Sequence, residues 1–432
     1  MKVGMISLGC SKNLMDSEKI MGMLKKGGHQ IVVDPKEADA IFVNTCGFIA
    51  PAKEEAINTV LEMSEYKQNN CKKLYMLGCM AQRYKSELEA SLPEVDRVIS
   101  IDEYNRIEEY LNEDLPDGSV PNWNDAERLV STAKHTAYLK IAEGCGNFCS
   151  FCAIPLIRGR FVSKTMEEIL KEAKMLEERG TKELVLIAQD TTRYGIDLYR
   201  KYALADLLKE LDKMDFKWIR ILYMYPEAIT YELVDTIAES KHVIPYFDIP
   251  LQSGNDRILK LMNRRNTSDE ALEKINYIRS KIPHAIFRTT FIAGFPTERK
   301  VEFNDTMRFA AKVRFDRLGA FPYSKEEGTK GAELKPEVAK KVRQARYDRL
   351  MQQQMIISSE KSAELIGKTL EVVVEGKEAL SNKYKGRSIY NAPDDVDGYV
   401  YFRSNKELSI GGFVNVKISK AYTYDLEGEQ VD

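Results

Sequence analysis

Three cysteines lie close together in the segment Cys145-Gly-Asn-Phe-Cys149-Ser-Phe-Cys152, directly after an apolar run. Three thiolates at this spacing can wrap one small metal cluster. A cubic iron–sulfur cluster usually has four cysteine ligands, so three would leave one iron open to a substrate or cofactor. The alternative is a structural zinc site, which needs a fourth ligand. His135, upstream of the segment, is the candidate for that ligand.

Three further cysteines are far apart in the sequence, but each ends or follows an apolar run and has a glycine beside it. Their contexts are Leu8-Gly9-Cys10, Asn44-Thr45-Cys46-Gly47 and Leu77-Gly78-Cys79. Ligands of open α/β sheets bind beyond the carboxyl ends of the strands, so these thiols could converge on one crevice. The glycines would let the backbone approach a bulky ligand closely. The alternative is three buried apolar thiols, which is common for free cysteine.

Composition limits the classes of protein to which the chain can belong. The 432 residues include seven cysteines, 64 basic and 66 acidic side chains, for a net charge of −2. That length indicates about three domains, and the charge excludes a globally basic nucleic-acid binder. No apolar run approaches the ~18 residues of a membrane span, and residues 1–10 do not resemble a secretory signal. We therefore expect a cytoplasmic protein, whose thiols are metal ligands or catalytic groups rather than disulfides.

The elements that must position these cysteines begin with an amino-terminal domain at residues 1–125. Alternating strands and helices predict an open α/β domain, with a mostly parallel sheet covered by helices on both faces. The expected strands are Lys2–Leu8, Gln30–Val33, Ala40–Val43, Lys73–Leu77 and Arg97–Ser100. The expected helices are Ser17–Lys26, Ala52–Lys67 and Tyr84–Leu92. A polar stretch at Asp114–Lys134 is expected to be a linker.

A second alternating block, residues 131–362, predicts a partial (β/α) barrel, because six strand–helix units are too few to close an eight-stranded one. The expected strands are Ala137–Ala142, Glu183–Ala188, Trp218–Met224, Tyr246–Ile249, Ile286–Ile292 and Arg317–Phe321. Thr165-x-x-Glu168 and Gly180 have the character of start and stop signals for the first helix of the block. A long helical pattern runs from Pro336 to Ile366. The active site of such a barrel lies at the carboxyl ends of its strands.

The last block, residues 366–432, predicts a small all-β barrel of the oligonucleotide-binding kind, with strands at Thr369–Val374, Tyr399–Phe402 and Phe413–Ala421. It holds nine Lys and Arg against eleven Asp and Glu. A domain that grips RNA is expected to be basic, whereas an acidic one suits a basic protein partner. The alternative is that the acids only form a solvated face.

The Cys145-x₃-Cys149-x₂-Cys152 spacing, with Phe151 before the last cysteine, resembles the radical S-adenosylmethionine superfamily. That resemblance implies a partial-barrel fold and a 4Fe–4S cluster whose open iron chelates the methionine part of S-adenosylmethionine. Electron transfer to the sulfonium then yields a 5′-deoxyadenosyl radical, which removes hydrogen from an unactivated carbon.

The whole chain resembles the methylthiotransferases of this superfamily, which combine a cysteine-triad domain, a radical domain and a TRAM barrel. The resemblance implies a second 4Fe–4S cluster, on Cys10, Cys46 and Cys79, that supplies or carries sulfur. One S-adenosylmethionine would give the methyl group and a second the radical. Cys71 is left over, and its polar surroundings predict a spare surface thiol.

Two branches of the family differ in substrate. Ser7-Leu8-Gly9-Cys10-Ser11-Lys12-Asn13-Leu14-Met15-Asp16-Ser17-Glu18 resembles the RimO branch, which modifies the β-carbon of an aspartate in ribosomal protein S twelve. Gln252-Ser253-Gly254-Asn255 is more similar to the alternative, transfer-RNA adenosine methylthiotransferases of the MiaB kind. Two positions depart from the usual pattern of the family. Ser11 stands where a proline is usual, and Thr297 stands where a glycine is usual. The RimO resemblance implies a basic ribosomal protein held by the TRAM domain and an electron donor such as flavodoxin or ferredoxin.

Polar residues near the expected strand ends, together with Phe151, are candidates for contact with S-adenosylmethionine or substrate. They are Phe151, Gln189, Arg220 and Gln252, with Asp190, Tyr223 and Arg288 as further possibilities. Beyond the cluster ligands the sequence indicates no catalytic residue. A hypothesis from a different class is a non-catalytic iron–sulfur or zinc protein that binds nucleic acid through its terminal barrel.

Overall fold

The computed structural model describes residues 1–111, 127–393 and 397–432, so much of the predicted linker lies outside the described residues. The chain divides into two compact units. The first comprises Met1–Ser131, Glu143–Phe161 and Glu326–Thr329, and the second comprises Thr132–Ala142, Val162–Lys325 and Lys330–Asp432. All six motif cysteines fall in the first unit.

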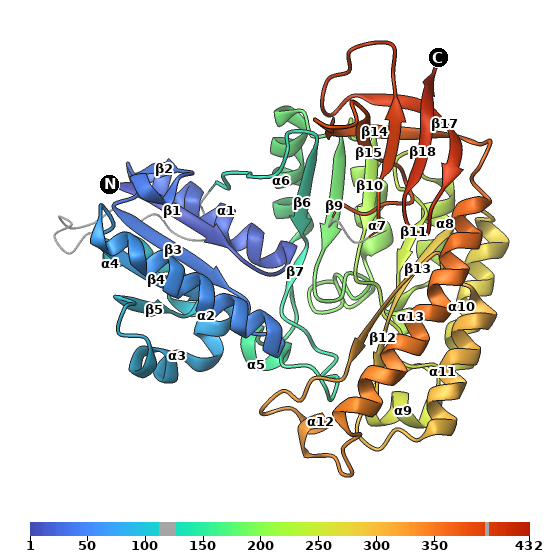
Figure 1. Ribbon diagram of the computed structural model, residues 1–432, viewed down its shortest axis with the longest axis horizontal. Helices are drawn as coiled ribbons and strands as arrows, with labels where there is room; N and C mark the ends of the chain where they lie inside the picture. Colours follow the sequence, from blue (N-terminus) through green and yellow to red (C-terminus); the bar gives the residue numbers. More distant parts are fainter. Residues whose placement is uncertain (112–126, 394–396) are drawn as a thin grey trace. The chain divides into compact units, whose positions relative to one another are not determined.

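The first unit is built on a five-stranded parallel sheet in the order β2-β1-β3-β4-β5 (Figure 1). Its strands are β1 (Lys2–Ser7), β2 (Gln30–Val32), β3 (Ala40–Thr45), β4 (Lys73–Gly78) and β5 (Arg97–Ile99). Its α-helices are α1 (Ser11–Lys26), α2 (Ala50–Ser64), α3 (Cys79–Ser91), α4 (Ile107–Leu111) and α5 (Ile154–Arg158). This arrangement confirms the predicted open α/β domain.

Successive side chains of the central strand β3 point to opposite faces of the sheet, and each face packs against its own layer of helices. Ile41 and Val43 pack in one buried cluster with residues of α2 and α3, whereas Ala40 and Phe42 pack in another with residues of α1 and α4. A parallel strand covered on both faces reads as a continuous apolar run, which is why this sheet could be recognised in the sequence.

Two helices begin earlier in the sequence than predicted, and each begins at or directly after a motif cysteine. Helix α1 begins at Ser11 rather than Ser17, with Cys10 as its N-cap. Helix α3 begins at Cys79 rather than Tyr84. The first turns of α1 hold buried polar residues, so the apolar period used for the prediction does not reach them.

The second unit holds six parallel strands in two sheets, ordered β10-β9-β6 and β11-β12-β13. An isolated parallel bridge pairs Ile219, in the edge strand β10, with Val243, and another pairs Gln252 with Phe291 of β12. The strands are β6 (Thr136–Lys140), β9 (Glu183–Ile187), β10 (Trp218–Ile221), β11 (Tyr246–Asp248), β12 (Ile286–Ala293) and β13 (Arg317–Pro322). All six predicted strands are present, which confirms the partial barrel.

Helices follow these strands, as the alternating pattern predicted (Figure 1). They are α6 (Met166–Arg179), α7 (Leu204–Leu211), α8 (Tyr231–Glu239), α9 (Asp256–Leu261), α10 (Ser268–Lys281), α11 (Lys300–Val313), α12 (Lys330–Glu333) and α13 (Lys340–Ala363). The capping box of Thr165 with Glu168 is confirmed at the start of α6, and Gly180 ends that helix in the left-handed conformation. Two short strands are β7 (Ala142–Glu143) and β8 (Val162–Ser163).

The carboxyl-terminal block is a closed barrel in the order β14-β15-β16-β18-β17. Its strands are β14 (Thr369–Lys377), β15 (Tyr384–Arg387), β16 (Val400–Arg403), β17 (Phe413–Ala421) and β18 (Leu426–Val431). The all-β prediction is confirmed, and β15 and β18 are additional to the three predicted strands.

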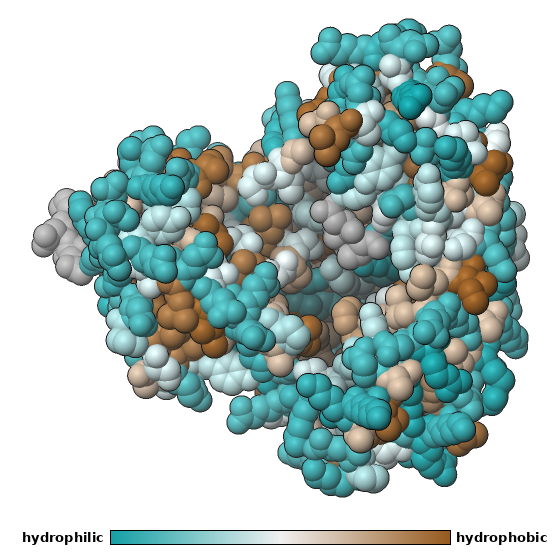
Figure 2. All heavy atoms as spheres, in the orientation of Figure 1, coloured by the Kyte–Doolittle hydropathy of each residue, from teal (hydrophilic) through white to brown (hydrophobic). Residues whose placement is uncertain are grey.

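Charged and polar side chains cover most of the face seen in Figure 2, and apolar side chains lie there in small groups. Within the described ranges, no helix is both long and apolar enough to cross a membrane.

Candidate functional site

The structure brings Cys10, Cys46 and Cys79 to one edge of the sheet. They follow β1, β3 and β4, which are neighbours in a parallel sheet and therefore end at the same edge. Cys46 lies against the loop before Cys10, because a Cβ placed on Gly9 would lie 2.8 Å from the Cys46 Cβ. The predicted convergence of strand ends thus places three thiols near one another.

Two glycines beside these thiols have positive φ, +83° at Gly9 and +98° at Gly78. A Cβ on Gly78 would lie 2.2 Å from the Asn44 Oδ1. The sequence predicted that the glycines admit a ligand. In the structure they allow the three cysteine loops to pack against each other, with backbone conformations that favour glycine.

Burial and the nearby cysteines disfavour the charged forms of the Cys46 and Cys79 thiols. Burial raises the pKa of Cys46, and the negative charge of Cys10 adds to this effect. Burial also raises the pKa of Cys79 to about 11, opposed by the positive charge of Arg158 and reinforced by Cys10 and Cys46. Metal binding needs thiolates, so a metal cluster bound here would displace protons from the cysteines.

The second triad occupies the loop between β7 and α5. The backbone N–H of Cys145 donates to the carbonyl of Gly159 at 3.1 Å, and that of Cys152 donates to the carbonyl of Cys149 at 3.0 Å. Cys145 and Cys149 are buried, whereas Cys152 is half-buried. Phe148 has a φ of +49°, a value rarely adopted by a residue with a bulky side chain. These contacts fold the three thiols into a tight loop.

Helix α5 joins this loop to the first triad. It begins two residues after Cys152, and a buried cluster unites Ala153 and Ile157 with Cys79. Both triads therefore belong to one compact unit.

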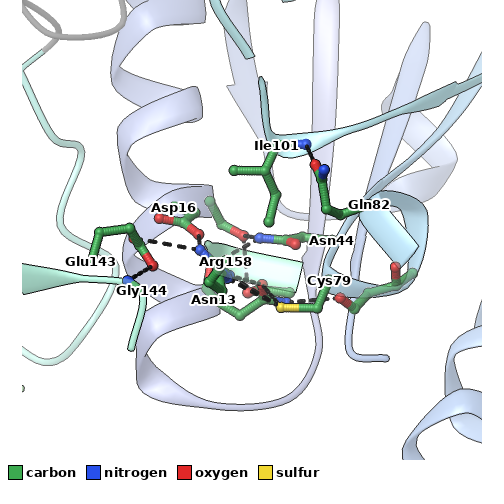
Figure 3. Close-up of polar contacts among 12 residues, drawn as sticks. Asn13, Asp16, Asn44, Cys79, Gln82, Ile101, Glu143, Gly144 and Arg158 are labelled. Carbon is green, nitrogen blue, oxygen red and sulfur yellow. Dashed lines mark hydrogen bonds and ion pairs between the residues drawn. The ribbon is translucent and has the colours of Figure 1, made fainter. Parts of the chain in front are cut away.

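A buried polar network surrounds Cys79 (Figure 3). Arg158, the last residue of α5, donates to the Cys79 Sγ from Nε at 3.3 Å and from Nη2 at 3.2 Å. The same guanidinium pairs with Asp16 and, at 3.6 Å, with Glu143. Its Nη2 also donates to the Asn13 Oδ1 at 3.0 Å. Sequence reasoning gave Arg158 no role, because no spacing or motif relates it to Cys79.

The donor sets of both triads suit iron–sulfur clusters, because soft thiolate ligands favour such clusters. In residues 1–111, 127–393 and 397–432, no three histidine, cysteine, aspartate or glutamate side chains are grouped to hold a single metal ion. His135, the candidate fourth zinc ligand, instead pairs with Glu375 at 3.2 Å. The zinc hypothesis therefore gains no support from the described contacts.

The predicted strand-end residues of the partial barrel have different surroundings. Gln252 follows β11 with a φ of +71°, and Tyr223 follows β10 with a φ of +62°. Such backbone strain at strand ends is typical of functional positions. Gln189 is half-buried, and the neighbouring Asp190 pairs with Arg193 at 3.1 Å.

Arg220 is enclosed within the second unit. Its Nε donates to Glu183 at 2.9 Å, and its Nη1 donates to the carbonyl of Ile389, in the terminal barrel, at 3.1 Å. These contacts favour a structural role for this arginine.

The prediction of a surface thiol at Cys71 was wrong. The residue is 4% exposed and packs in the apolar cluster between the sheet and α2 and α3. Its polar neighbours along the chain misled the prediction, because the Cys71 side chain turns inward.

Three known families match successive parts of the chain. "Uncharacterized protein family UPF0004" matches residues 2–100, the radical SAM superfamily matches residues 139–310, and the TRAM domain matches residues 366–431.

Curated relatives match almost the entire chain. A protein of Thermoanaerobacter sp. is 46% identical over 99% of this chain and 99% of its own length, and one of Clostridioides difficile is 46% identical over 99% and 98%. Both are named ribosomal protein uS12 methylthiotransferase RimO. Among solved structures, the radical S-adenosylmethionine methyltransferase TsrM of Kitasatospora setae has a TM-score of 0.55 at 12% identity, over 77% of this chain and 75% of its own. That likeness concerns the fold alone.

Proposed function

The chain belongs to the family of ribosomal protein uS12 methylthiotransferases, and we propose that it converts an aspartate of that ribosomal protein to 3-methylthioaspartate. As a radical S-adenosylmethionine transferase, it uses an iron–sulfur cluster and S-adenosylmethionine. The proposed reaction inserts sulfur at the aspartate β-carbon and then methylates that sulfur.

The main structural support is the presence of both cysteine triads in one compact unit, joined by α5. We assign one 4Fe–4S cluster to Cys145, Cys149 and Cys152, and a second, on the sulfur side, to Cys10, Cys46 and Cys79. The first cluster with S-adenosylmethionine supplies radical chemistry at an unactivated carbon, and the second supplies sulfur. Two molecules of S-adenosylmethionine are consumed in this proposal, one for the radical and one for the methyl group.

The chain's own side chains have three tasks in this reaction. The burial of Cys145 and Cys149 would keep these two proposed cluster ligands away from bulk water. The Cys145 N–H bond to Gly159 holds the loop that presents the three thiols. Phe151, Gln189 and Gln252 are proposed to orient S-adenosylmethionine or the substrate, with Gln252 held in a strained backbone conformation.

The terminal barrel is the proposed contact for the ribosomal protein. Its nine basic and eleven acidic residues give it a slight negative charge, which complements a basic protein better than it does a phosphate backbone. A flavodoxin or ferredoxin is the proposed class of electron donor.

Substrate identity is tested by incubating the reduced enzyme with S-adenosylmethionine and either the ribosomal protein or transfer RNA. Mass spectrometry of the digested products should find one added methylthio group on an aspartate-containing peptide and none on the RNA. A methylthioadenosine in the RNA, with unmodified protein, would instead establish the alternative substrate.

Cluster number is tested by anaerobic metal analysis of the intact enzyme. Two cubic clusters correspond to about eight irons per chain. About four irons would leave only one cluster, and bound zinc in place of iron would favour a non-catalytic binding protein.

A further inference from the structure

Arg158 lies at the junction of the two cysteine triads. It ends α5, the helix that follows Cys152, yet its guanidinium donates to the sulfur of Cys79. Resting on the two-cluster function proposed above, we infer that Arg158 is a positioning residue. It fixes the Cys79 sulfur as a cluster ligand and adjusts the reduction potential of the cluster on Cys10, Cys46 and Cys79.

The Arg158 guanidinium donates two hydrogen bonds to the same sulfur. Nε and Nη2 lie 3.3 and 3.2 Å from the Cys79 Sγ, so two parallel N–H groups address one sulfur. The side chain of Arg158 is only 1% exposed. A planar guanidinium in a dry site constrains the sulfur more tightly than a single flexible cation would.

Hydrogen bonds of Asn13 connect Arg158 to the loops of the other two cysteines. Its amide nitrogen donates to the carbonyl of Leu8 at 2.8 Å and to that of Thr45 at 3.2 Å. Those carbonyls lie just before Cys10 and Cys46. The two bonds leave the Asn13 Oδ1 to accept from Arg158 at 3.0 Å. One asparagine–arginine pair therefore connects the segments of all three cysteines.

The buried Arg158 guanidinium has two carboxylate partners besides the Cys79 sulfur. Asp16 pairs directly with Arg158, and the more distant Glu143 is 37% exposed. A buried guanidinium requires acceptors for its donors, and the Cys79 sulfur is one of them. N–H donors and positive charge at a ligand sulfur stabilise the more negative, reduced state of a cluster. Removing them should therefore make reduction harder.

The test isolates the cluster on Cys10, Cys46 and Cys79 in the full chain by replacing Cys145, Cys149 and Cys152 with alanine. After anaerobic reconstitution with iron and sulfide, the midpoint potential is measured by a redox titration followed by electron paramagnetic resonance. Arg158→Gln should shift the midpoint to a more negative value, so that the reduced fraction at the parent's midpoint falls several-fold. Arg158→Lys keeps the charge but loses the paired N–H donors, and should shift the midpoint less.

Arg128→Gln is the matched control. Arg128 is also buried and pairs at 3.4 Å with Glu18, on the same helix as Asp16. An unmoved midpoint in Arg158→Gln, or an equal shift in Arg128→Gln, overturns the role of Arg158. If Arg158→Gln does not fold, Arg158→Lys decides, and a midpoint equal to the parent's overturns the role. A parent that binds no cluster overturns the two-cluster function itself, which distinguishes the two failures.

Discussion

Each cysteine triad has a separate task in the proposed reaction, so single substitutions should separate two half-reactions. Cys149→Ala removes a ligand of the radical-side cluster and should reduce the cleavage of S-adenosylmethionine to background. Cys46→Ala should leave that cleavage within about twofold of the parent but stop sulfur insertion, because it removes a ligand of the other cluster. Chromatography of 5′-deoxyadenosine and mass spectrometry of the ribosomal protein measure the two steps.

Cys71 provides a control thiol from the same unit. It is buried away from both triads in the apolar cluster of α2 and α3, where its Sγ donates to the carbonyl of Lys73 at 3.2 Å. Cys71→Ala should leave the iron content unchanged and cost about 1 kcal/mol of stability.

Continued methylthiolation by Cys46→Ala would contradict the two-cluster proposal.

Only some of the residues of the site could be predicted from the sequence. Short spacing predicted Cys145, Cys149 and Cys152 as cluster ligands, and strand-end placement predicted that the other three cysteines converge. Arg158 could not be found in this way, because a hydrogen bond between residues far apart in the sequence leaves no periodic pattern. Cys71 was misplaced for a related reason, since side-chain direction depends on packing rather than on the polarity of neighbouring residues.

At the scale of elements, buried strands were predictable and polar ones were not. The six strands of the partial barrel have apolar runs because helices cover them. Strands β15 (Tyr384–Arg387) and β18 (Leu426–Val431) are short on apolar residues, since small barrels bury only alternate side chains. Only pairing with β14, β16 and β17 identifies them as strands.

The capping box of α6 gives a direct test at the element scale. The Thr165 hydroxyl accepts from the Glu168 backbone N–H at 3.2 Å, and the Glu168 carboxylate accepts from the Thr165 N–H at 2.8 Å. Thr165→Ala should cost about 1 kcal/mol, because it leaves a helix N–H without its acceptor. Native-state hydrogen exchange should show faster exchange at the Glu168 amide, and Thr165→Ser should restore protection. Unchanged exchange in the alanine variant would show that the cap contributes nothing.

The loop after β12 contains a residue in a strained conformation. Thr297 has a φ of +67°, which is costly for a β-branched side chain, and this explains why glycine suits the position. Arg257 compensates in part, donating to the Thr297 carbonyl at 2.8 Å and to its hydroxyl at 3.2 Å. Thr297→Gly should raise the free energy of unfolding by about 0.5–1 kcal/mol after the greater flexibility of glycine in the unfolded chain is allowed for. Denaturant titration measures this change, and a destabilised variant would mean that the hydroxyl contact outweighs the strain.

At the scale of the whole second unit, a buried ion network fastens the terminal barrel to the partial barrel. Glu183, at the start of β9, pairs with Arg220 at 2.9 Å and with Arg387 of the terminal barrel at 2.6 Å. Arg387 also pairs with Glu375, which in turn pairs with His135. Trp218 and Phe413 add an edge-to-face aromatic contact at 4.8 Å between the same two parts. These ionic and aromatic contacts join the terminal barrel to the partial barrel.

This network predicts a loss of stability in acid. Burial alone would raise the pKa of Glu375, but His135 and Arg387 together lower it from 4.5 to about 2. Because the folded pKa lies below the unfolded one, the contribution of Glu375 is fully present above pH 4.5 and is lost as the pH falls toward 2. At 1.36 kcal/mol per unit of pKa, that contribution is about 3 kcal/mol.

Glu375→Gln removes this titration and should therefore be less stable than the parent at pH 7 but nearly equal to it near pH 2. Denaturant unfolding at several pH values measures the gap between the two proteins, which should narrow by about 3 kcal/mol between pH 6 and pH 2. Glu407→Gln, at an exposed position of the same barrel, serves as the control and should track the parent throughout. A gap that stays constant as the pH falls would mean that Glu375 titrates alike in the folded and unfolded chains. In that case the ion pairs of Glu375 could not help to fasten the two barrels at neutral pH, and the pair of Glu183 with Arg387 and the contact of Trp218 with Phe413 would have to do so.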